Sequence, residues 1–215
     1  MTDVIVIDKL TKSFKGKTVL EDVNMQLQEG RIYGIVGDNG SGKTVLLKLI
    51  CGFMKPDSGT VTVNGKVIGK DSDFPENTGI IIEAPGFLPN YSGMKNLEYL
   101  ASIRGKIGKD QIESAMKKVG LDPSSKLRVS KYSLGMKQRL GIAQAIMEDQ
   151  QLLILDEPMN ALDKDAVEEM RKLFLSFKAS GKTMLIVSHN EGDISILCDE
   201  VYEFDGARIK RRENV

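Results

Sequence analysis

The first third of the chain alternates short apolar runs with glycine and polar residues, a pattern typical of β-strands. The expected strands cover residues 4–7, 19–27, 32–36 and 79–82. Residues 61–68 carry Asn64-Gly65 at their centre, the preferred two-residue turn of a β-hairpin. A glycine-rich stretch follows the strand at 32–36, and residues 45–50 then have apolar positions at helical spacing. The pattern therefore predicts a strand–loop–helix unit among further strands.

From about residue 87 to residue 148 the apolar positions recur every three or four residues, which indicates amphipathic helices. Three helices are expected, marked by Leu97, Leu100 and Ile103, by Ile112, Met116 and Val119, and by a start near Ser133. An uninterrupted apolar strand at 152–155 then precedes a one-sided helix at 167–177 and a strand at 184–187. Strands that alternate with helices predict a mainly parallel sheet covered on both faces, and so an α/β fold.

The composition excludes several classes of protein. Hydrophobic residues make up 41% and charged residues 28% of 215 residues, which excludes a disordered chain. Thirty basic residues balance thirty acidic ones, so we expect no nucleic-acid partner that binds through bulk charge. No run approaches ~18 apolar residues and the N-terminal segment is not basic, so neither a membrane span nor a signal peptide is expected. Two cysteines, Cys51 and Cys198, are too few for a disulfide framework and favour a reducing compartment.

The loop after the strand at 32–36 matches the phosphate-binding pattern G-x-x-x-x-G-K-[ST]. Its residues are Gly37, Asp38, Asn39, Gly40, Ser41, Gly42, Lys43 and Thr44. The glycines let backbone N–H groups curl round an anion, and the N-terminus of the following helix adds a partial positive charge. Lys43 can contact the β- and γ-phosphates of a nucleotide, and the Thr44 hydroxyl can ligate Mg²⁺. The strand–loop–helix context favours nucleotide binding over a chance glycine-rich turn.

Two acidic residues, Asp156 and Glu157, end the apolar strand at 152–155. In open α/β sheets the ligand lies at the carboxyl ends of the strands, so both carboxylates are expected to face the phosphate-binding loop. Asp156 is expected to hold Mg²⁺, and Glu157 to orient and polarise an attacking water. Taken alone, the pair also fits a solvated strand end, but the loop beside it favours the catalytic interpretation.

Three further positions have open interpretations. Ser133 is a good helix N-cap, and the free N–H groups behind it form either an ordinary capped helix start or a second anion site. His189, the only histidine, follows the strand at 184–187 and is either a structural group or a phosphate sensor. Phe14 can belong to the core or stack on a base.

Taken together and in this order, these segments resemble the ATP-binding subunit of ATP-binding-cassette (ABC) transporters over nearly the whole chain. The resemblance implies a P-loop NTPase (RecA-like) fold with a mainly parallel core sheet, an N-terminal antiparallel β subdomain and an inserted helical lobe. One ABC ATPase domain over residues 1–215 is expected. Its nucleotide-binding core comprises residues 1–86 and 149–215, and its helical signature lobe comprises residues 87–148. The implied cofactors are ATP and Mg²⁺.

The resemblance also gives roles to the residues that bind the nucleotide. Phe14 resembles the aromatic residue that stacks on adenine. Ser133 and Gly135 match the family signature Leu-Ser-Gly-Gly-Gln, and so are implied to contact ATP. The signature is not complete here, because Leu134 replaces its first glycine and Met136 its glutamine.

Catalytic and metal roles follow in the same way. Lys43, Glu157 and His189 are the implied catalytic residues, with His189 resembling the γ-phosphate switch. Glu83 stands where the family usually has a glutamine that joins the core to the helical lobe, which implies a metal contact for its carboxylate. A solvated loop residue is the alternative interpretation of Glu83.

In this family two ATP-binding subunits form a head-to-tail dimer, and each ATP lies between one chain's phosphate loop and the other chain's signature helix. The implied partners are a second copy or a homologous ATPase subunit, and a separate transmembrane permease. Residues 160–163 resemble the loop that crosses this dimer. The implied location is cytoplasmic, on the inner face of the cell membrane through the permease.

Residues 82–90 and 133–140 are similar to bacterial exporters of bacitracin, lantibiotics and related drugs, so an ATP-driven exporter subunit is expected. A soluble ABC-type ATPase that acts on ribosomes or DNA is the alternative. It fits less well, because those types generally carry a second cassette or a long coiled-coil insertion. A regulatory subunit without turnover is disfavoured because Glu157 is present.

Overall fold

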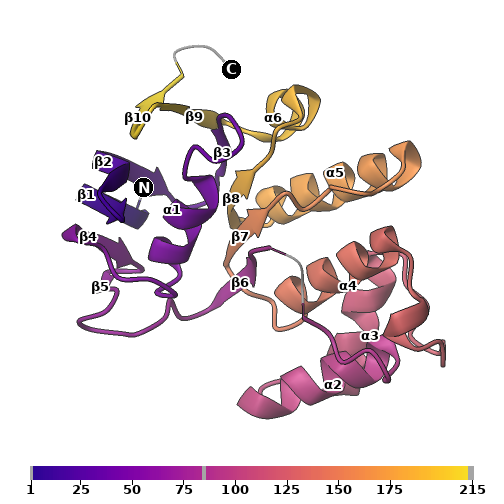
Figure 1. Cartoon of the computed structure of the whole chain (residues 1–215). Helices are drawn as coiled ribbons and strands as arrows, with labels where there is room; N and C mark the ends of the chain where they lie inside the picture. The colour runs from indigo at the N-terminus through magenta and orange to yellow at the C-terminus, as the bar shows by residue number, and fades with distance from the viewer. Residues whose placement is uncertain (1, 84–85, 213–215) are drawn as a thin grey trace.

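The computed structural model describes residues 2–83 and 86–212, and Figure 1 shows two β-sheets with helices around them. The smaller sheet is antiparallel, with the strand order β2-β1-β4-β5. Its strands are β1 (Asp3–Phe14), β2 (Lys17–Gln28), β4 (Ser58–Val63) and β5 (Lys66–Val67). β4 and β5 form the expected hairpin, in which Asn64 and Gly65 have φ of 51° and 75°. A type I′ turn needs positive φ at both central residues, which explains the Asn-Gly pair.

The larger sheet has the strand order β10-β9-β3-β8-β7-β6. Its strands are β3 (Ile32–Val36), β6 (Thr78–Ile81), β7 (Leu152–Asp156), β8 (Thr183–Val187), β9 (Glu200–Asp205) and β10 (Arg208–Arg211). Only the β10–β9 pair is antiparallel, and every other pair in this sheet is parallel. The predicted α/β fold with a mainly parallel sheet is therefore confirmed.

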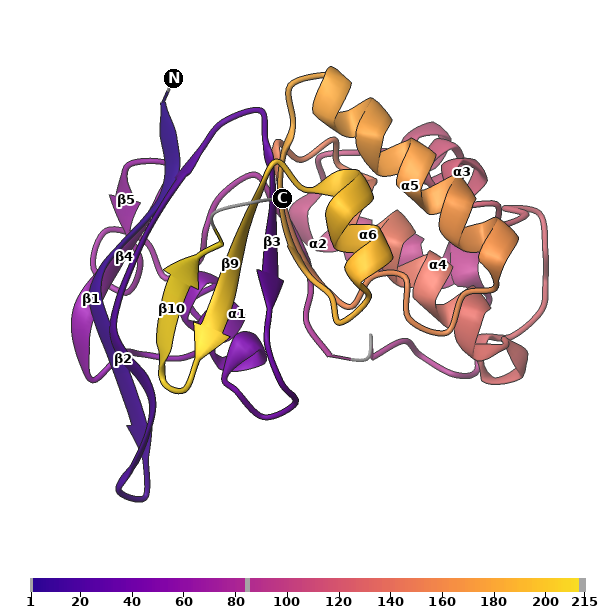
Figure 2. The ribbon, with the colours of Figure 1, turned by 90° about the horizontal axis from the view of Figure 1, so that it is seen from above.

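Helices cover both faces of the larger sheet (Figure 2). These helices are α1 (Lys43–Ile50), which lies between the two sheets, and α5 (Lys164–Ala179) and α6 (Glu191–Leu197), which lie on the opposite face. Alternate residues of β7 serve two different cores. Leu152 and Ile154 pack with α1 and the smaller sheet, whereas Leu153 and Leu155 pack with the helices on the other face. The apolar run at 152–155 is uninterrupted because both faces of this strand are buried.

Three helices and a short 3₁₀ turn form a separate group beside β6 (Figure 1). They are α2 (Gly93–Arg104), α3 (Lys109–Lys118), the 3₁₀ turn (Val129–Lys131) and α4 (Leu134–Ile146). All three expected helices are thus confirmed, and Ser133 caps α4 by accepting a 3.1 Å hydrogen bond from the Met136 N–H. Close packing joins this group to the sheet, because a Cβ on Gly79 of β6 would lie 2.0 Å from the Ala145 carbonyl oxygen.

Three elements have no counterpart in the hydrophobic pattern. Helix α6 is only seven residues long, and β10 consists of Arg208, Ile209, Lys210 and Arg211 at the edge of the sheet. Strand β9 lies inside the sheet and depends on its parallel pairing with β3, which is far away in the sequence. Such short or edge elements depend on tertiary contacts rather than on a periodic signal of their own.

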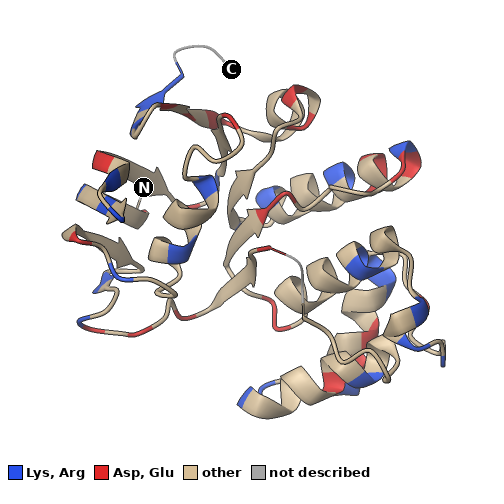
Figure 3. Cartoon of the chain, in the orientation of Figure 1, with Lys and Arg blue, Asp and Glu red and all other residues tan. Residues whose placement is uncertain are grey.

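Charges of both signs are mixed over the surface, with a run of basic residues at β10 (Figure 3). Within the described residues, no helix combines the length and the apolar character needed to cross a bilayer. Cys51 and Cys198 are both buried and free, and burial raises the pKa of each thiol to about 12. Neither cysteine is therefore a reactive group at neutral pH.

Candidate functional site

The phosphate-binding loop connects β3 to α1, and tight packing enforces its glycines. Gly42 has φ of 114°, and a Cβ there would lie 2.8 Å from a methyl group of Val19. Gly37 has φ of 149°, and its Cβ would lie 2.8 Å from the Phe204 Cβ. Both positions therefore exclude a side chain on conformational and steric grounds. The loop is held against β2 and β9 and presents its backbone at the start of α1.

Lys43 is buried at the mouth of this loop, with 8% of its surface exposed. Its Nζ donates hydrogen bonds to the carbonyl oxygens of Gly37 at 2.7 Å and Asp38 at 2.8 Å. The buried Ser41 hydroxyl finds no hydrogen-bond partner among the residues that the structure describes. An orphaned donor, a lysine and a helix N-terminus at one point form a site suited to phosphate.

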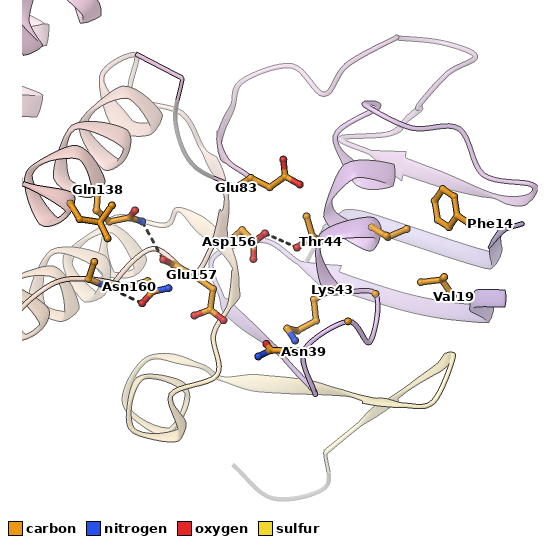
Figure 4. A pocket seen from close by; sticks show the side chains of 15 residues that line it. Phe14, Val19, Asn39, Lys43, Thr44, Glu83, Gln138, Asp156, Glu157 and Asn160 are labelled. Carbon is orange, nitrogen blue, oxygen red and sulfur yellow. Dashed lines mark hydrogen bonds between the residues drawn. The ribbon is translucent and has the colours of Figure 1, made fainter. Parts of the chain in front are cut away.

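Thr44 and Asp156 meet across the site, from α1 and from the end of β7. The Thr44 hydroxyl donates a 2.9 Å hydrogen bond to Oδ2 of Asp156 (Figure 4). Burial raises the pKa of Asp156 and the Glu157 carboxylate raises it further, whereas the Thr44 hydroxyl, Lys43 and the Glu83 backbone N–H lower it. A buried carboxylate of this kind is stabilised by a cation beside it.

This pair of oxygens fits Mg²⁺. Over residues 2–83 and 86–212 no cluster of three or more His, Cys, Asp or Glu side chains could hold a metal ion. Mg²⁺ does not require such a cluster, since it commonly binds through one or two protein oxygens together with phosphate and water. The sequence-based prediction that Thr44 and Asp156 hold the ion agrees with the type and position of their oxygens.

Glu157 and His189 follow the ends of the neighbouring parallel strands β7 and β8. Oε2 of Glu157 lies 2.9 Å from Nδ1 of His189. The Glu157 backbone is left-handed, with φ of 48°, and its N–H donates to the Val187 carbonyl at 2.9 Å. The structure therefore brings together two residues that the sequence separates by 32 positions (from 157 to 189), as expected for parallel strand ends.

Glu83 lies at the same edge of the sheet, but its side chain turns away from Asp156 (Figure 4). Its carboxylate forms an ion pair of 2.6 Å with Nζ of Lys48 on α1, and 62% of this side chain is exposed. The Glu83 side chain does not contribute to the shifted pKa of Asp156, which the Glu83 backbone N–H lowers. The Glu83 carboxylate thus contacts a lysine here, and its metal contact stays a prediction. Ala84 and Pro85, which follow it, lie outside the described residues.

Most of these groups line one hollow of about 570 Å³. Its lining includes Phe14, Val19, Asn39, Gly40, Gly42, Lys43, Thr44, Glu83, Asp156 and Glu157, and on the opposite side Leu134, Gln138, Asn160 and Ala161. Phe14 is 41% exposed, so its ring is available for stacking on a base. His189 lines a second hollow that shares Asn39, Glu157 and Asn160 with the first. Ser133 and Gly135 are not part of either lining.

Sequence reasoning missed three residues that shape the site. Val19 packs on the loop from β2, and Lys48 neutralises Glu83. Gln138 donates from Nε2 to two carbonyl oxygens of the turn that follows β7. Gln138 alone gave a usable signal, because it is a polar residue within the signature segment 133–140, on the helix that the Ser133 cap begins. The partners of Val19 and Lys48 are set by tertiary packing.

Comparisons with known proteins agree with this geometry. The profile of the ABC transporter family matches residues 20–160. The ABC transporter ATP-binding protein YybJ of Bacillus subtilis (strain 168) is 41% identical over 212 residues, covering 99% of this chain and 97% of the relative. The bacitracin transport ATP-binding protein BcrA of Enterococcus faecalis is 41% identical over 210 residues, covering 94% of this chain and 66% of the relative. The lantibiotic transport ATP-binding protein SrtF of Streptococcus pyogenes is 35% identical over 211 residues, covering 98% and 91%.

A solved structure of an ATP-binding subunit of an ABC transporter has the same fold, with a TM-score of 0.86 at 24% identity. The superposed region covers 96% of this chain and 88% of that chain. This likeness supports the fold, and the sequence relatives support the family. The chain belongs to the ABC transporter family as an ATP-binding protein with an ABC ATPase domain, close to the bacitracin and lantibiotic transport ATP-binding proteins.

Proposed function

We propose that this chain hydrolyses ATP to power a membrane exporter of a peptide antibiotic or drug, through closure of an ATP-bound dimer. The observation that carries the proposal is the Glu157 carboxylate, held by His189 beside the phosphate-binding loop. A subunit that only sensed nucleotide would not need a water-activating carboxylate. The substrate class rests on BcrA and SrtF, which are named for bacitracin and lantibiotic transport.

Each group of the site has a role in this proposal. Lys43 and the free N–H groups of the loop hold the β- and γ-phosphates of ATP. Thr44 and Asp156 hold Mg²⁺, which neutralises phosphate charge when it is bound. Glu157 polarises the attacking water, and His189 orients the Glu157 carboxylate and lies close enough to sense the γ-phosphate. Phe14 supplies a face for the adenine ring.

The proposed working unit has two ATP-binding chains and a permease. The hollow beside the loop is open to solvent, so one chain is expected to leave part of an ATP molecule uncovered. The capped N-terminus of α4, with Ser133 and Gly135, offers N–H groups to the ATP of a second copy or a homologous subunit. Transport also needs a membrane-spanning path, which a separate permease supplies. This chain binds to that permease at the inner face of the cell membrane.

One set of measurements tests both parts of the proposal, the export of a drug and the hydrolysis of ATP. Cells that express this chain together with its permease, to be sought among the neighbouring genes, are expected to tolerate more bacitracin or lantibiotic. Glu157→Gln should remove this tolerance and reduce ATP turnover of the purified chain roughly a hundredfold or more, because the amide cannot act as a general base. ATP binding should persist in this variant.

The matched control is Glu29→Gln, an exposed residue of the turn between β2 and β3. It should keep both tolerance and turnover. Turnover that is unchanged by Glu157→Gln contradicts the assigned base. An active ATPase that confers no tolerance to any of these drugs contradicts the exporter assignment alone.

A further inference from the structure

Gln138 connects the signature helix to the backbone that carries the catalytic carboxylate. It lies on α4, and its Nε2 donates to the carbonyl oxygen of Glu157 at 3.2 Å (Figure 4). The same Nε2 also donates to the carbonyl oxygen of Pro158 at 3.0 Å. Because both partners are acceptors, the amide nitrogen must face them. The side chain is half-buried, so these bonds are partly shielded from water.

The backbone that Gln138 contacts is in an unusual conformation. Glu157 has φ of 48° although it is not a glycine, and such a conformation persists only where surrounding contacts maintain it. The same Glu157 carbonyl also accepts a 3.1 Å hydrogen bond from the Asn160 N–H, which closes the turn after β7. Gln138 is therefore one of the contacts that fix the direction in which the Glu157 side chain leaves the strand.

A second contact holds the same helix face against the same turn. Gly135 lies three residues before Gln138, so the two occupy one face of α4. A Cβ on Gly135 would lie 3.0 Å from the carbonyl oxygen of Ala161, where Ala161 itself has φ of 64°. The start of α4 and the turn at residues 157–161 are therefore packed directly against each other.

We propose that Gln138 is a positioning residue that links the two ATP sites of the dimer. This inference rests on the proposed function, in which α4 of one chain contacts the partner's ATP while Glu157 of the same chain serves its own ATP. The position of α4 then determines the orientation of the Glu157 carboxylate through the hydrogen bonds of Gln138. ATP engaged at one site thereby orients the general base at the other site.

Substitutions at Gln138 separate this role from a general effect on folding. Gln138→Met keeps the length of the side chain but removes the donor, and it should reduce the kcat for ATP at least about tenfold with KM changed less than about twofold. Gln138→Lys restores a donor that reaches the same carbonyls, and should recover most of the kcat. Gln144→Met on the same helix is the control and should behave as wild type, because the Gln144 side chain has no hydrogen bond to any of the described residues.

Mixed dimers test the direction of the link. When Gln138→Met and Glu157→Gln are in the same chain beside a wild-type chain, the working Glu157 keeps its own Gln138. The ATP turnover of this dimer should equal that of a dimer in which one chain carries Glu157→Gln alone and the other chain is wild type. When the two substitutions are in different chains, the only working Glu157 lacks Gln138, and turnover should fall about tenfold.

Three results overturn the inference: normal turnover of Gln138→Met, failure of Gln138→Lys to recover the kcat, or an equal or larger loss when both substitutions share one chain. The last result would mean that Gln138 acts on the partner's ATP through α4. The proposed function is tested separately by the wild-type chain. A wild type without ATPase activity overturns both proposals, whereas an active wild type with a normal Gln138→Met variant overturns only this one.

Discussion

Lys43 is already in position in the structure, because two carbonyl oxygens of the loop accept its ammonium hydrogens. A side chain fixed in this way loses little conformational freedom when phosphate binds. Lys43→Ala is expected to weaken ATP binding at least about tenfold, which corresponds to roughly 1.4 kcal/mol, as measured by calorimetry. Lys55→Ala, an exposed control in the loop after α1, should bind ATP as wild type does. Equal affinities of the two variants would contradict the assignment of the loop.

Glu83 is predicted from the sequence to contact the metal, and the structure adds an ion pair between its carboxylate and Lys48. In the structure its carboxylate is paired with Lys48 and exposed, so the pair contributes little to stability. We predict that the carboxylate can exchange Lys48 for the metal. Glu83→Gln should then raise the Mg²⁺ concentration for half-maximal ATPase activity, and Lys48→Met, which frees the carboxylate, should lower it. Identical Mg²⁺ dependence in wild type and both variants would show that this charge has no role.

At the scale of single elements, the sequence predicted correctly those features that depend on residues next to one another. The Asn64-Gly65 turn, the loop at 37–44 and the Ser133 cap each depend on residues next to one another, and all three occur as predicted. Strand β10 was missed, because a polar edge strand has no periodic apolar pattern. The Lys48–Glu83 pair was missed because its partners belong to different elements.

The close contact between β6 and α4 predicts that a larger residue at Gly79 destabilises the fold. Gly79→Ala would place its Cβ 2.0 Å from the Ala145 carbonyl oxygen and 2.7 Å from Leu153. The strand and the helix must then separate, so we expect a loss of about 1–3 kcal/mol in the free energy of unfolding, measured with urea. Gly86→Ala is the control, because its Cβ would meet no atom within 4 Å. A loss of the same size in both variants would exclude packing as the cause.

At the scale of the whole molecule, the open hollow predicts assembly that depends on ATP. Without ATP, the two anion-binding ends of the proposed dimer lack their shared ligand, so the purified chain should be mainly monomeric. Glu157→Gln with ATP should accumulate as a dimer in gel filtration, because bound ATP is not consumed. Adding Lys43→Ala to this variant should restore the monomer. A tight dimer without nucleotide, seen by light scattering, would contradict the prediction.

The strand order of the larger sheet also governs when this protein can first bind nucleotide during its synthesis. Strand β3, which leads into the phosphate-binding loop, pairs among the described strands with β8 and β9, and their residues 183–187 and 200–205 are translated long after it. A nascent chain that ends before β8 therefore has a β3 strand with no neighbour on either side. The glycine-rich loop therefore gains its rigid support only after residues 183–205 have been translated. ATP binding by this chain thus requires that the polypeptide has left the ribosome and folded at least as far as β9.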